Sequence, residues 1–177
     1  KEDLLALVQT EKIVALFGKS GYGKSSLIRA GLIPILPENV VPIIVQFGAY
    51  RSVGSNEIAL QYPPILTTKK RLQQSLPNNA DKMKFLESIS DTSTLWYHFK
   101  RKQSTDSHQF LLIFDQFEEF DSYPPEQRAA FKQQLAELLY TRIPQALRDR
   151  SDALTDEQQA LLARPLEVRA LFAIRED

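Results

Sequence analysis

The sequence has no cysteine, only two histidines, and no apolar run close to the length of a membrane span. The absence of cysteine excludes a disulfide scaffold, thiol catalysis and a cysteine-ligated zinc site. His98 and His108 have no acid at ligand spacing, so a metal site built on histidine is not expected. A spanning helix needs roughly 20 apolar residues, so we expect no membrane contact.

An excess of either charge is also missing, since Lys plus Arg and Asp plus Glu both total 22. Without a basic excess, nucleic acid is not expected as a direct partner. The 177 residues, 43% hydrophobic and 25% charged, suit one globular domain with a real core. A chain without cysteine suits a reducing compartment, and we expect a cytoplasmic protein.

What is present is a glycine-rich motif near the start of the chain. Residues 18–25, GKSGYGKS, fit the pattern G-x-x-x-x-G-K-[ST] of a loop that wraps nucleotide phosphates. Residues 12–17, KIVALF, form an apolar run of strand type. Residues 26–32, SLIRAGL, favour a helix that Pro34 ends. Strand, loop and helix are the setting that this motif requires, so the sequence predicts a phosphate-binding loop.

The residue types in this loop suit a ligand of high negative charge. Glycines at positions 18, 21 and 23 permit positive φ and close approach of backbone N–H groups. Lys24 is predicted to reach the β- and γ-phosphates, and the Ser25 hydroxyl to bind Mg²⁺. The predicted nucleotide contacts are consecutive in the sequence: Gly18, Lys19, Ser20, Gly21, Tyr22, Gly23, Lys24, Ser25 and Ser26. For Tyr22 the two alternatives are that it shields the phosphates or that it fills a loop position, and we favour the second.

A second candidate group follows the apolar run 110–115, which suits a buried parallel strand. Such a strand carries Asp115 to the carboxyl edge of the sheet, where ligands of open α/β folds bind. Asp115 is therefore predicted to hold Mg²⁺ directly or through water. Glu118 and Glu119 are candidates for the carboxylate that activates the attacking water. The alternative is an acidic helix start after a core strand.

The third candidate is Arg175, which follows the apolar run 168–174 and should lie at the same edge of the sheet. An arginine there can sense a γ-phosphate and stabilise transition-state charge. The alternative is an ordinary surface arginine. Arg29, on the helix after the loop, is expected to be a solvated charge without a role.

The remaining pattern alternates strands with helices, which predicts an α/β fold with a parallel sheet covered on both faces. Pro42 favours either a sheet edge or a strand start for the strand 40–47. The helix that starts at Pro124 carries one apolar stripe of Phe131, Leu135, Leu138 and Leu139. Other helices are expected at 2–9, 82–88, 93–102 and in parts of 142–165, whereas 51–77 has no clear pattern.

The segments GKSGYGKSSLIRAGLIP and LLIFDQFEEF resemble the STAND class of P-loop ATPases, the signal-transduction ATPases with numerous domains. Within that class the chain is similar to the novel STAND bacterial group. The stretches VVPIIVQF, TLWYHF and ALFAIRED agree, so the resemblance covers almost the whole chain. The acids after Asp115 also resemble the NACHT branch, which makes Glu119 the first candidate for the catalytic carboxylate and Glu118 the second.

The resemblance implies a three-layer P-loop NTPase fold. The family's strand order is 5-1-4-3-2, and the fifth strand is missing here, so we expect the order 1-4-3-2 with the strand 12–17 at an exposed edge. We expect residues 1–177 to be an NTPase domain cut from a longer protein, without its flanking N-terminal and C-terminal parts. The chain departs from many relatives at Gln46, where they carry arginine.

The function implied by the resemblance is a switch. ATP with Mg²⁺ is bound and slowly hydrolysed, ADP holds the resting form, and fused sensor and effector domains read the signal through a regulated homo-oligomer in bacterial signalling or defence. The alternative is a nucleotide-binding oligomerisation scaffold without significant turnover. A small-molecule kinase is a third possibility, but the paired acids suit water activation better, and no arginine-rich lid is evident.

Overall fold

The computed structural model describes residues 1–51, 62–76, 82–103 and 108–176. Within these residues, four strands form one parallel sheet in the order β1-β4-β3-β2. The strands are β1 (Ile13–Gly18), β2 (Val40–Gln46), β3 (Gln109–Asp115) and β4 (Val168–Arg175). This is the predicted order, with β1 at one edge. Pro42 lies in β2, the other edge strand, as its missing N–H favours.

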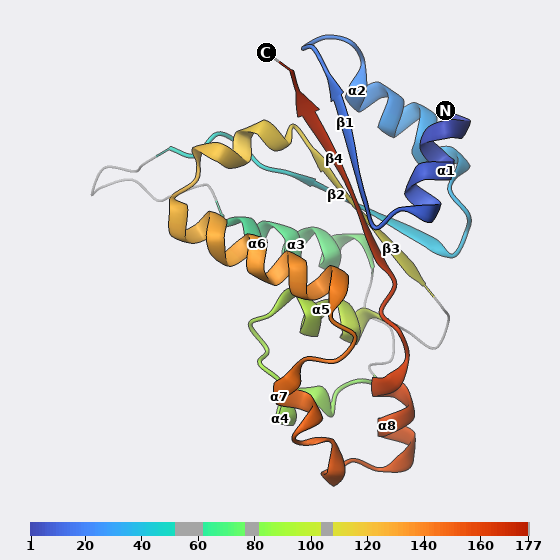
Figure 1. The fold of residues 1–177 in the computed structure, drawn as a ribbon, viewed down its shortest axis with the longest axis vertical. Helices are drawn as coiled ribbons and strands as arrows, with labels where there is room; N and C mark the ends of the chain where they lie inside the picture. Colours follow the sequence, from blue (N-terminus) through green and yellow to red (C-terminus); the bar gives the residue numbers. More distant parts are fainter. Residues whose placement is uncertain (52–61, 77–81, 104–107, 177) are drawn as a thin grey trace.

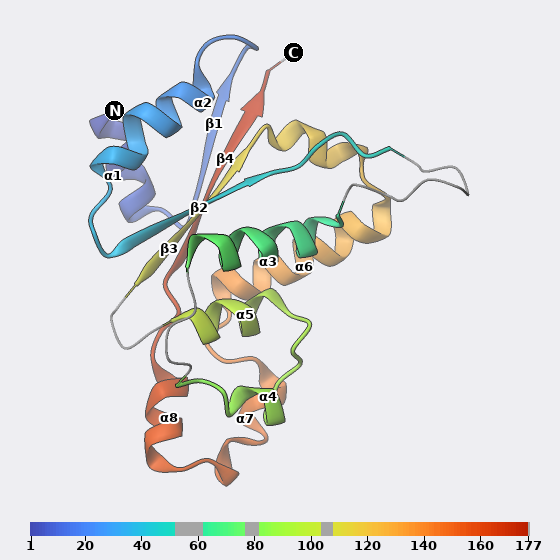
Figure 2. The same cartoon turned by 180° about the vertical axis from the view of Figure 1, so that it is seen from behind.

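Helices cover both faces of the sheet, which gives the predicted three-layer sandwich (Figure 1). One face carries α1 (Glu2–Thr10) and α2 (Lys24–Ser26), and the other carries α3 (Pro64–Ser75) and α6 (Pro125–Tyr140). The view from behind shows the same two layers (Figure 2). Each face has its own cluster of buried apolar side chains. No helix in the described part of the chain is long and apolar enough to cross a membrane.

The difference between centre and edge of the sheet is visible in the strands themselves. Every residue of β3 after Gln109 is buried, as expected of a strand covered on both faces. In β1, Val14 is buried, whereas Ile13 and Phe17 are 45% and 57% exposed. One face of β1 thus packs under α1 and α2, while the other face and the outer edge stay uncovered by the described residues.

The stripe predicted for the helix after Pro124 is confirmed. α6 begins at Pro125, whose fixed φ suits the first helical turn and whose missing N–H is not needed there. Its buried residues are the four of the predicted stripe, Phe131, Leu135, Leu138 and Leu139. Phe131 meets Phe114 of β3 edge to face, with the ring centroids 5.7 Å apart. This packing fixes α6 against the strand that carries Asp115.

The helix after the phosphate loop begins at Lys24, slightly before the predicted run 26–32, and does not keep α-helical winding. Three residues of α2 lead into a π-helix over Leu27–Leu32 and a 3₁₀ turn over Ile33–Ile35. The N–H of Ile33 donates to Ile28 O, the wider i to i−5 step of π winding. Ile28 and Leu32 are buried against the sheet, which anchors this wider helix.

A lobe of short helices lies at the other end of the sheet from the phosphate loop (Figure 1). Its members are α4 (Leu86–Ile89), α5 (Leu95–Lys102), α7 (Gln145–Arg148), a 3₁₀ turn (Ser151–Ala153) and α8 (Asp156–Ala163). Thr94 caps α5 by accepting from the N–H of Tyr97, so this helix starts two residues later than predicted. Trp96 is fully buried and donates to Thr141 O at 3.1 Å, as a core residue should.

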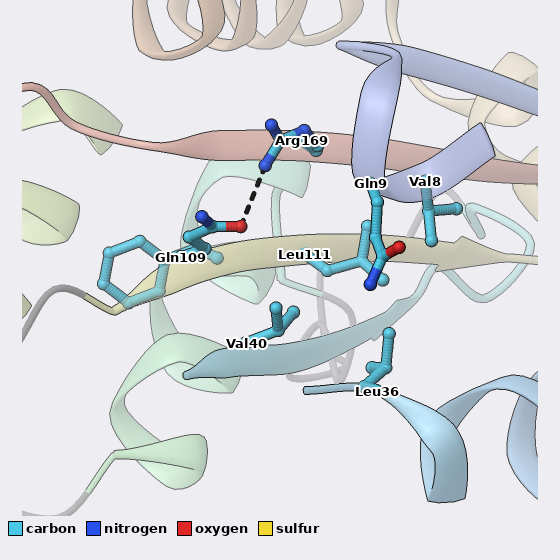
Figure 3. A pocket seen from close by; sticks show the side chains of 8 residues that line it. Val8, Gln9, Leu36, Val40, Gln109, Leu111 and Arg169 are labelled. Carbon is cyan, nitrogen blue, oxygen red and sulfur yellow. Dashed lines mark hydrogen bonds between the residues drawn. The ribbon is translucent and has the colours of Figure 1, made fainter. Parts of the chain in front are cut away.

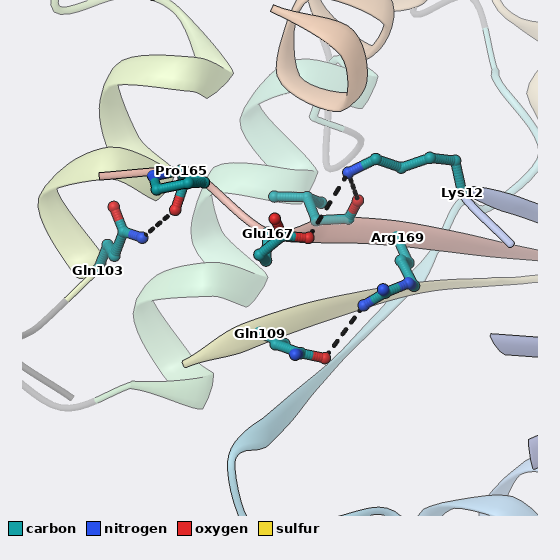
Figure 4. A network of polar contacts seen from close by, with 7 residues as sticks. Lys12, Gln103, Gln109, Pro165, Glu167 and Arg169 are labelled. Carbon is teal, nitrogen blue, oxygen red and sulfur yellow. Dashed lines mark hydrogen bonds and ion pairs between the residues drawn. The ribbon is translucent and has the colours of Figure 1, made fainter. Parts of the chain in front are cut away.

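Polar contacts join the amino ends of β1, β3 and β4 to one another (Figure 4). Lys12 donates to Val168 O at 3.2 Å and lies 3.9 Å from a carboxylate oxygen of Glu167. Arg169 donates to Gln109 at 3.0 Å. A small pocket nearby, between α1 and the sheet, includes Val8 and Leu111 in its lining (Figure 3). None of the predicted site residues lines this pocket.

Candidate nucleotide-binding site

The predicted site residues come together at the carboxyl edge of the sheet. The last residues of the four strands are Gly18, Gln46, Asp115 and Arg175. Gly18 pairs with Arg175 across β1 and β4, and Gln46 pairs with Asp115 across β2 and β3. Because all strands run parallel, a ligand held by the loop after β1 also lies next to the ends of β4 and β3.

The phosphate loop depends on backbone conformations that favour glycine. Gly21 and Gly23 have φ values of 80° and 76°, in the left-handed region. A Cβ atom at either position meets nothing within 4 Å, so conformation rather than space requires glycine here. At Gly18, by contrast, an added Cβ atom lies 3.6 Å from the side chain of Lys24. This is an ordinary van der Waals distance, so the space around Gly18 in this structure does not by itself require glycine.

The ammonium group of Lys24 is held inside the loop. Its Nζ donates to Gly18 O and, at 3.1 Å, to Lys19 O. These two carbonyl contacts hold the cation inside the loop. Because the ammonium group has three N–H donors, one remains for a further acceptor. Tyr22 is 79% exposed at the tip of the same loop.

The two predicted magnesium ligands are in direct contact. Ser25 Oγ donates to Asp115 Oδ1 at 2.8 Å, although the residues are 90 positions apart. Asp115 is 3% exposed. A hydroxyl and a carboxylate are the hard oxygen donors that Mg²⁺ prefers, and Mg²⁺ completes its shell with water and substrate phosphates. The donor set therefore fits this ion. The described residues hold no group of three or more His, Asp or Glu side chains that could bind a metal alone.

Arg29 also reaches Asp115, so its interpretation as a plain solvated charge was wrong. Its guanidinium nitrogen lies 3.5 Å from Asp115 Oδ2, and its side chain is 53% exposed. Arg29 stands one helical turn after Ser25, and residues at this spacing share a helix face. The spacing in the sequence could have indicated a shared partner, but nothing in it named Asp115.

The chain turns sharply directly after Asp115. Gln116 has φ 59° and ψ 48°, a left-handed conformation that is costly for a residue other than glycine. Its side chain accepts a hydrogen bond from Gln46 Nε2, which ties the turn to β2. A 3₁₀ helix, Phe117–Ser122, begins at once and carries both candidate carboxylates. The alternative of an acidic helix start is therefore also an accurate description of this segment.

Glu118 and Glu119 have different surroundings. Glu118 Oε2 accepts from the backbone N–H of Arg175 at 3.1 Å, so this carboxylate contacts the strand that pairs with the phosphate loop. Glu119 donates its backbone N–H to Gln116 O at 3.2 Å. Burial raises the pKa of the Tyr123 phenol, and the nearby charge of Glu119 raises it further. The end of β4, with Arg175, thus lies between the loop and Glu118.

Comparison with known proteins identifies the family of the chain. The family model described as Novel STAND NTPase 1 matches residues 1–176. No curated protein and no solved structure gave a significant match. The family match covers the phosphate loop, the strand that ends at Asp115 and the strand that ends at Arg175. The chain therefore belongs to the novel STAND NTPase 1 family, a family of nucleotide-binding NTPases.

Proposed function

We propose that this chain binds ATP with Mg²⁺ at the carboxyl edge of its sheet and hydrolyses it slowly. The nucleotide state then serves as the switch of a multidomain bacterial signalling or defence protein. The observation that carries the proposal is the Ser25–Asp115 contact of 2.8 Å beside a loop that already holds the Lys24 ammonium group. A hydroxyl, a carboxylate and a cation at one edge of the sheet are the kinds of group that a Mg–triphosphate site uses, and their presence together supports the proposal.

Binding in this proposal rests on residues 18–26. Their backbone N–H groups surround the phosphates, since the positive φ values of Gly21 and Gly23 turn successive amides toward one side. Lys24 reaches the β- and γ-phosphates from the position that its carbonyl contacts give it. Ser25 and Asp115 would hold Mg²⁺, and the bound ion would neutralise part of the negative charge of the phosphates.

For hydrolysis we propose that Glu119 orients and deprotonates the attacking water. Glu118 already uses one carboxylate oxygen to accept from Arg175 N, so we assign it the role of holding the end of β4 in place. Arg175, paired in register with Gly18, is proposed to contact the γ-phosphate and stabilise the charge that develops on it. Regulated homo-oligomerisation and fused sensor and effector domains complete the proposed switch.

The binding part is tested by calorimetry with Mg–ATP on the wild type, Lys24→Ala and Lys12→Ala. Lys12 is a matched control, because the same charge is removed at the amino end of β1, where it contacts Val168 O and Glu167. We expect Lys24→Ala to lose most of the affinity and Lys12→Ala to keep it. Equal affinity of the Lys24 variant and the wild type contradicts the proposal. Binding without phosphate release supports the scaffold alternative instead.

A further inference from the structure

Asp115 is a buried carboxylate whose two oxygens face different partners. Oδ1 accepts from Ser25, while Oδ2 faces the guanidinium group of Arg29 at 3.5 Å. The side chain of Asp115 is 4% exposed. A charge buried this deeply is costly unless a counter-charge compensates it. Arg29 is the only cation that forms an ion pair with Asp115 among the described residues.

The contact with Arg29 is suited to being given up. The guanidinium nitrogen of Arg29 lies 3.5 Å from Asp115 Oδ2, which is longer than the roughly 2.7–2.9 Å of a strong charge-assisted hydrogen bond. With 53% of its side chain exposed, Arg29 reaches water by rotating outward. Its charge is permanent in the physiological range, because guanidinium does not lose its proton there. Arg29 thus carries a permanent positive charge but forms only a weak ion pair with Asp115.

From this geometry we propose that Arg29 is a placeholder cation that occupies Asp115 while no divalent ion is bound. It is a positioning residue: it stabilises the carboxylate beside Ser25, and it leaves when Mg²⁺ arrives, because two cations at one carboxylate repel each other. Arg29 therefore sets the concentration of Mg²⁺ at which nucleotide binds. This inference rests on the proposed Mg²⁺ site at Ser25 and Asp115.

The test measures the Mg²⁺ dependence of ATP binding for the wild type, Arg29→Gln, Arg29→Lys and Arg128→Gln. Arg128 is the control, since it also forms an ion pair, with the exposed Asp121 at 3.3 Å, away from Asp115. We expect the half-saturating Mg²⁺ concentration to fall about tenfold in Arg29→Gln, as one competing charge is removed. Arg29→Lys keeps the charge and should stay near the wild type, as should Arg128→Gln. Thermal melts check that each variant is folded.

A second measurement separates this inference from the proposed function. Mn²⁺ is titrated into the nucleotide-free chain and followed by electron paramagnetic resonance, with Asp115→Asn as the variant that should lose the site. Tighter Mn²⁺ binding by Arg29→Gln than by the wild type supports the placeholder role even if ATP does not bind. An unchanged or higher half-saturating concentration in Arg29→Gln overturns it, because Arg29 then either has no influence on the ion or helps to hold it.

Discussion

Ser25 and Asp115 form a 2.8 Å hydrogen bond that joins the first turn after the phosphate loop to the end of the central strand β3. The bond connects two parts of the site that lie 90 positions apart in the sequence. Since ordering a site on binding costs free energy, a contact that already exists lowers this cost. The hydrogen bond fixes the helix after the phosphate loop against the end of β3.

The first prediction concerns this bond. Ser25→Ala leaves a buried carboxylate oxygen without its donor, so the free energy of unfolding should fall by about 1.5–3 kcal/mol, the range for hydrogen bonds to charged groups. Urea denaturation of the nucleotide-free chain measures this change. Ser26→Ala is the matched control, because Ser26 is exposed and lies next to Ser25 on the same helix. Equal stability of the two variants contradicts the structural role of the bond.

The second prediction separates the two candidate carboxylates. Glu119→Gln should keep ATP affinity and lose phosphate release, because the amide cannot take a proton from water. Glu118→Gln should keep much of the activity, since an amide oxygen still accepts from Arg175 N, whereas Glu118→Ala should lose it together with affinity. Single-turnover phosphate release and calorimetry measure the two effects. Full loss of turnover in Glu118→Gln, with Glu119→Gln active, reverses the assignment.

The third prediction concerns Lys100, a buried lysine in the lobe. Its Nζ donates to Gln103 Oε1 at 2.8 Å and to Arg164 O at 2.6 Å, both uncharged acceptors. Burial, with smaller contributions from the charges of Arg164 and Arg142, lowers the pKa of Lys100 from 10.5 to about 8. At pH 7 the folded chain therefore holds a buried cation without an ion-pair partner among these contacts.

The sign of the pH dependence follows from this shift. Below pH 8 Lys100 is charged in both the folded and the unfolded chain, so its effect on stability is constant. Between pH 8 and 10.5 the folded chain releases the proton first, and the free energy of unfolding rises by up to about 3 kcal/mol. Chemical denaturation at several pH values should show this rise in the wild type and in the exposed control Lys132→Met. If the rise in the free energy of unfolding persists in Lys100→Met, another titrating group causes it.

Local sequence patterns were sufficient where the information lies within consecutive residues. The glycine spacing of residues 18–25 predicted the loop, and the apolar stripe of α6 predicted its four buried side chains. The run before Asp115 predicted a strand buried on both faces. The strand order, with β1 at an edge, came from the resemblance to STAND proteins. Periodicity alone does not order parallel strands, because every buried strand has the same pattern.

The contacts between distant segments were decided by the tertiary structure alone. Arg29 and Lys100 looked like ordinary cations in the sequence, yet one pairs with Asp115 and the other is buried in the lobe. The link between Glu118 and Arg175 N was equally invisible. Each depends on which strand lies beside which, and on the angle at which a helix crosses the sheet. The sequence by itself determined which chemical groups are available at the carboxyl edge of the sheet. Tertiary packing determined which of these groups contact one another. The reason is that the arrangement of strands and helices depends on burial of the whole core rather than on any local stretch of sequence.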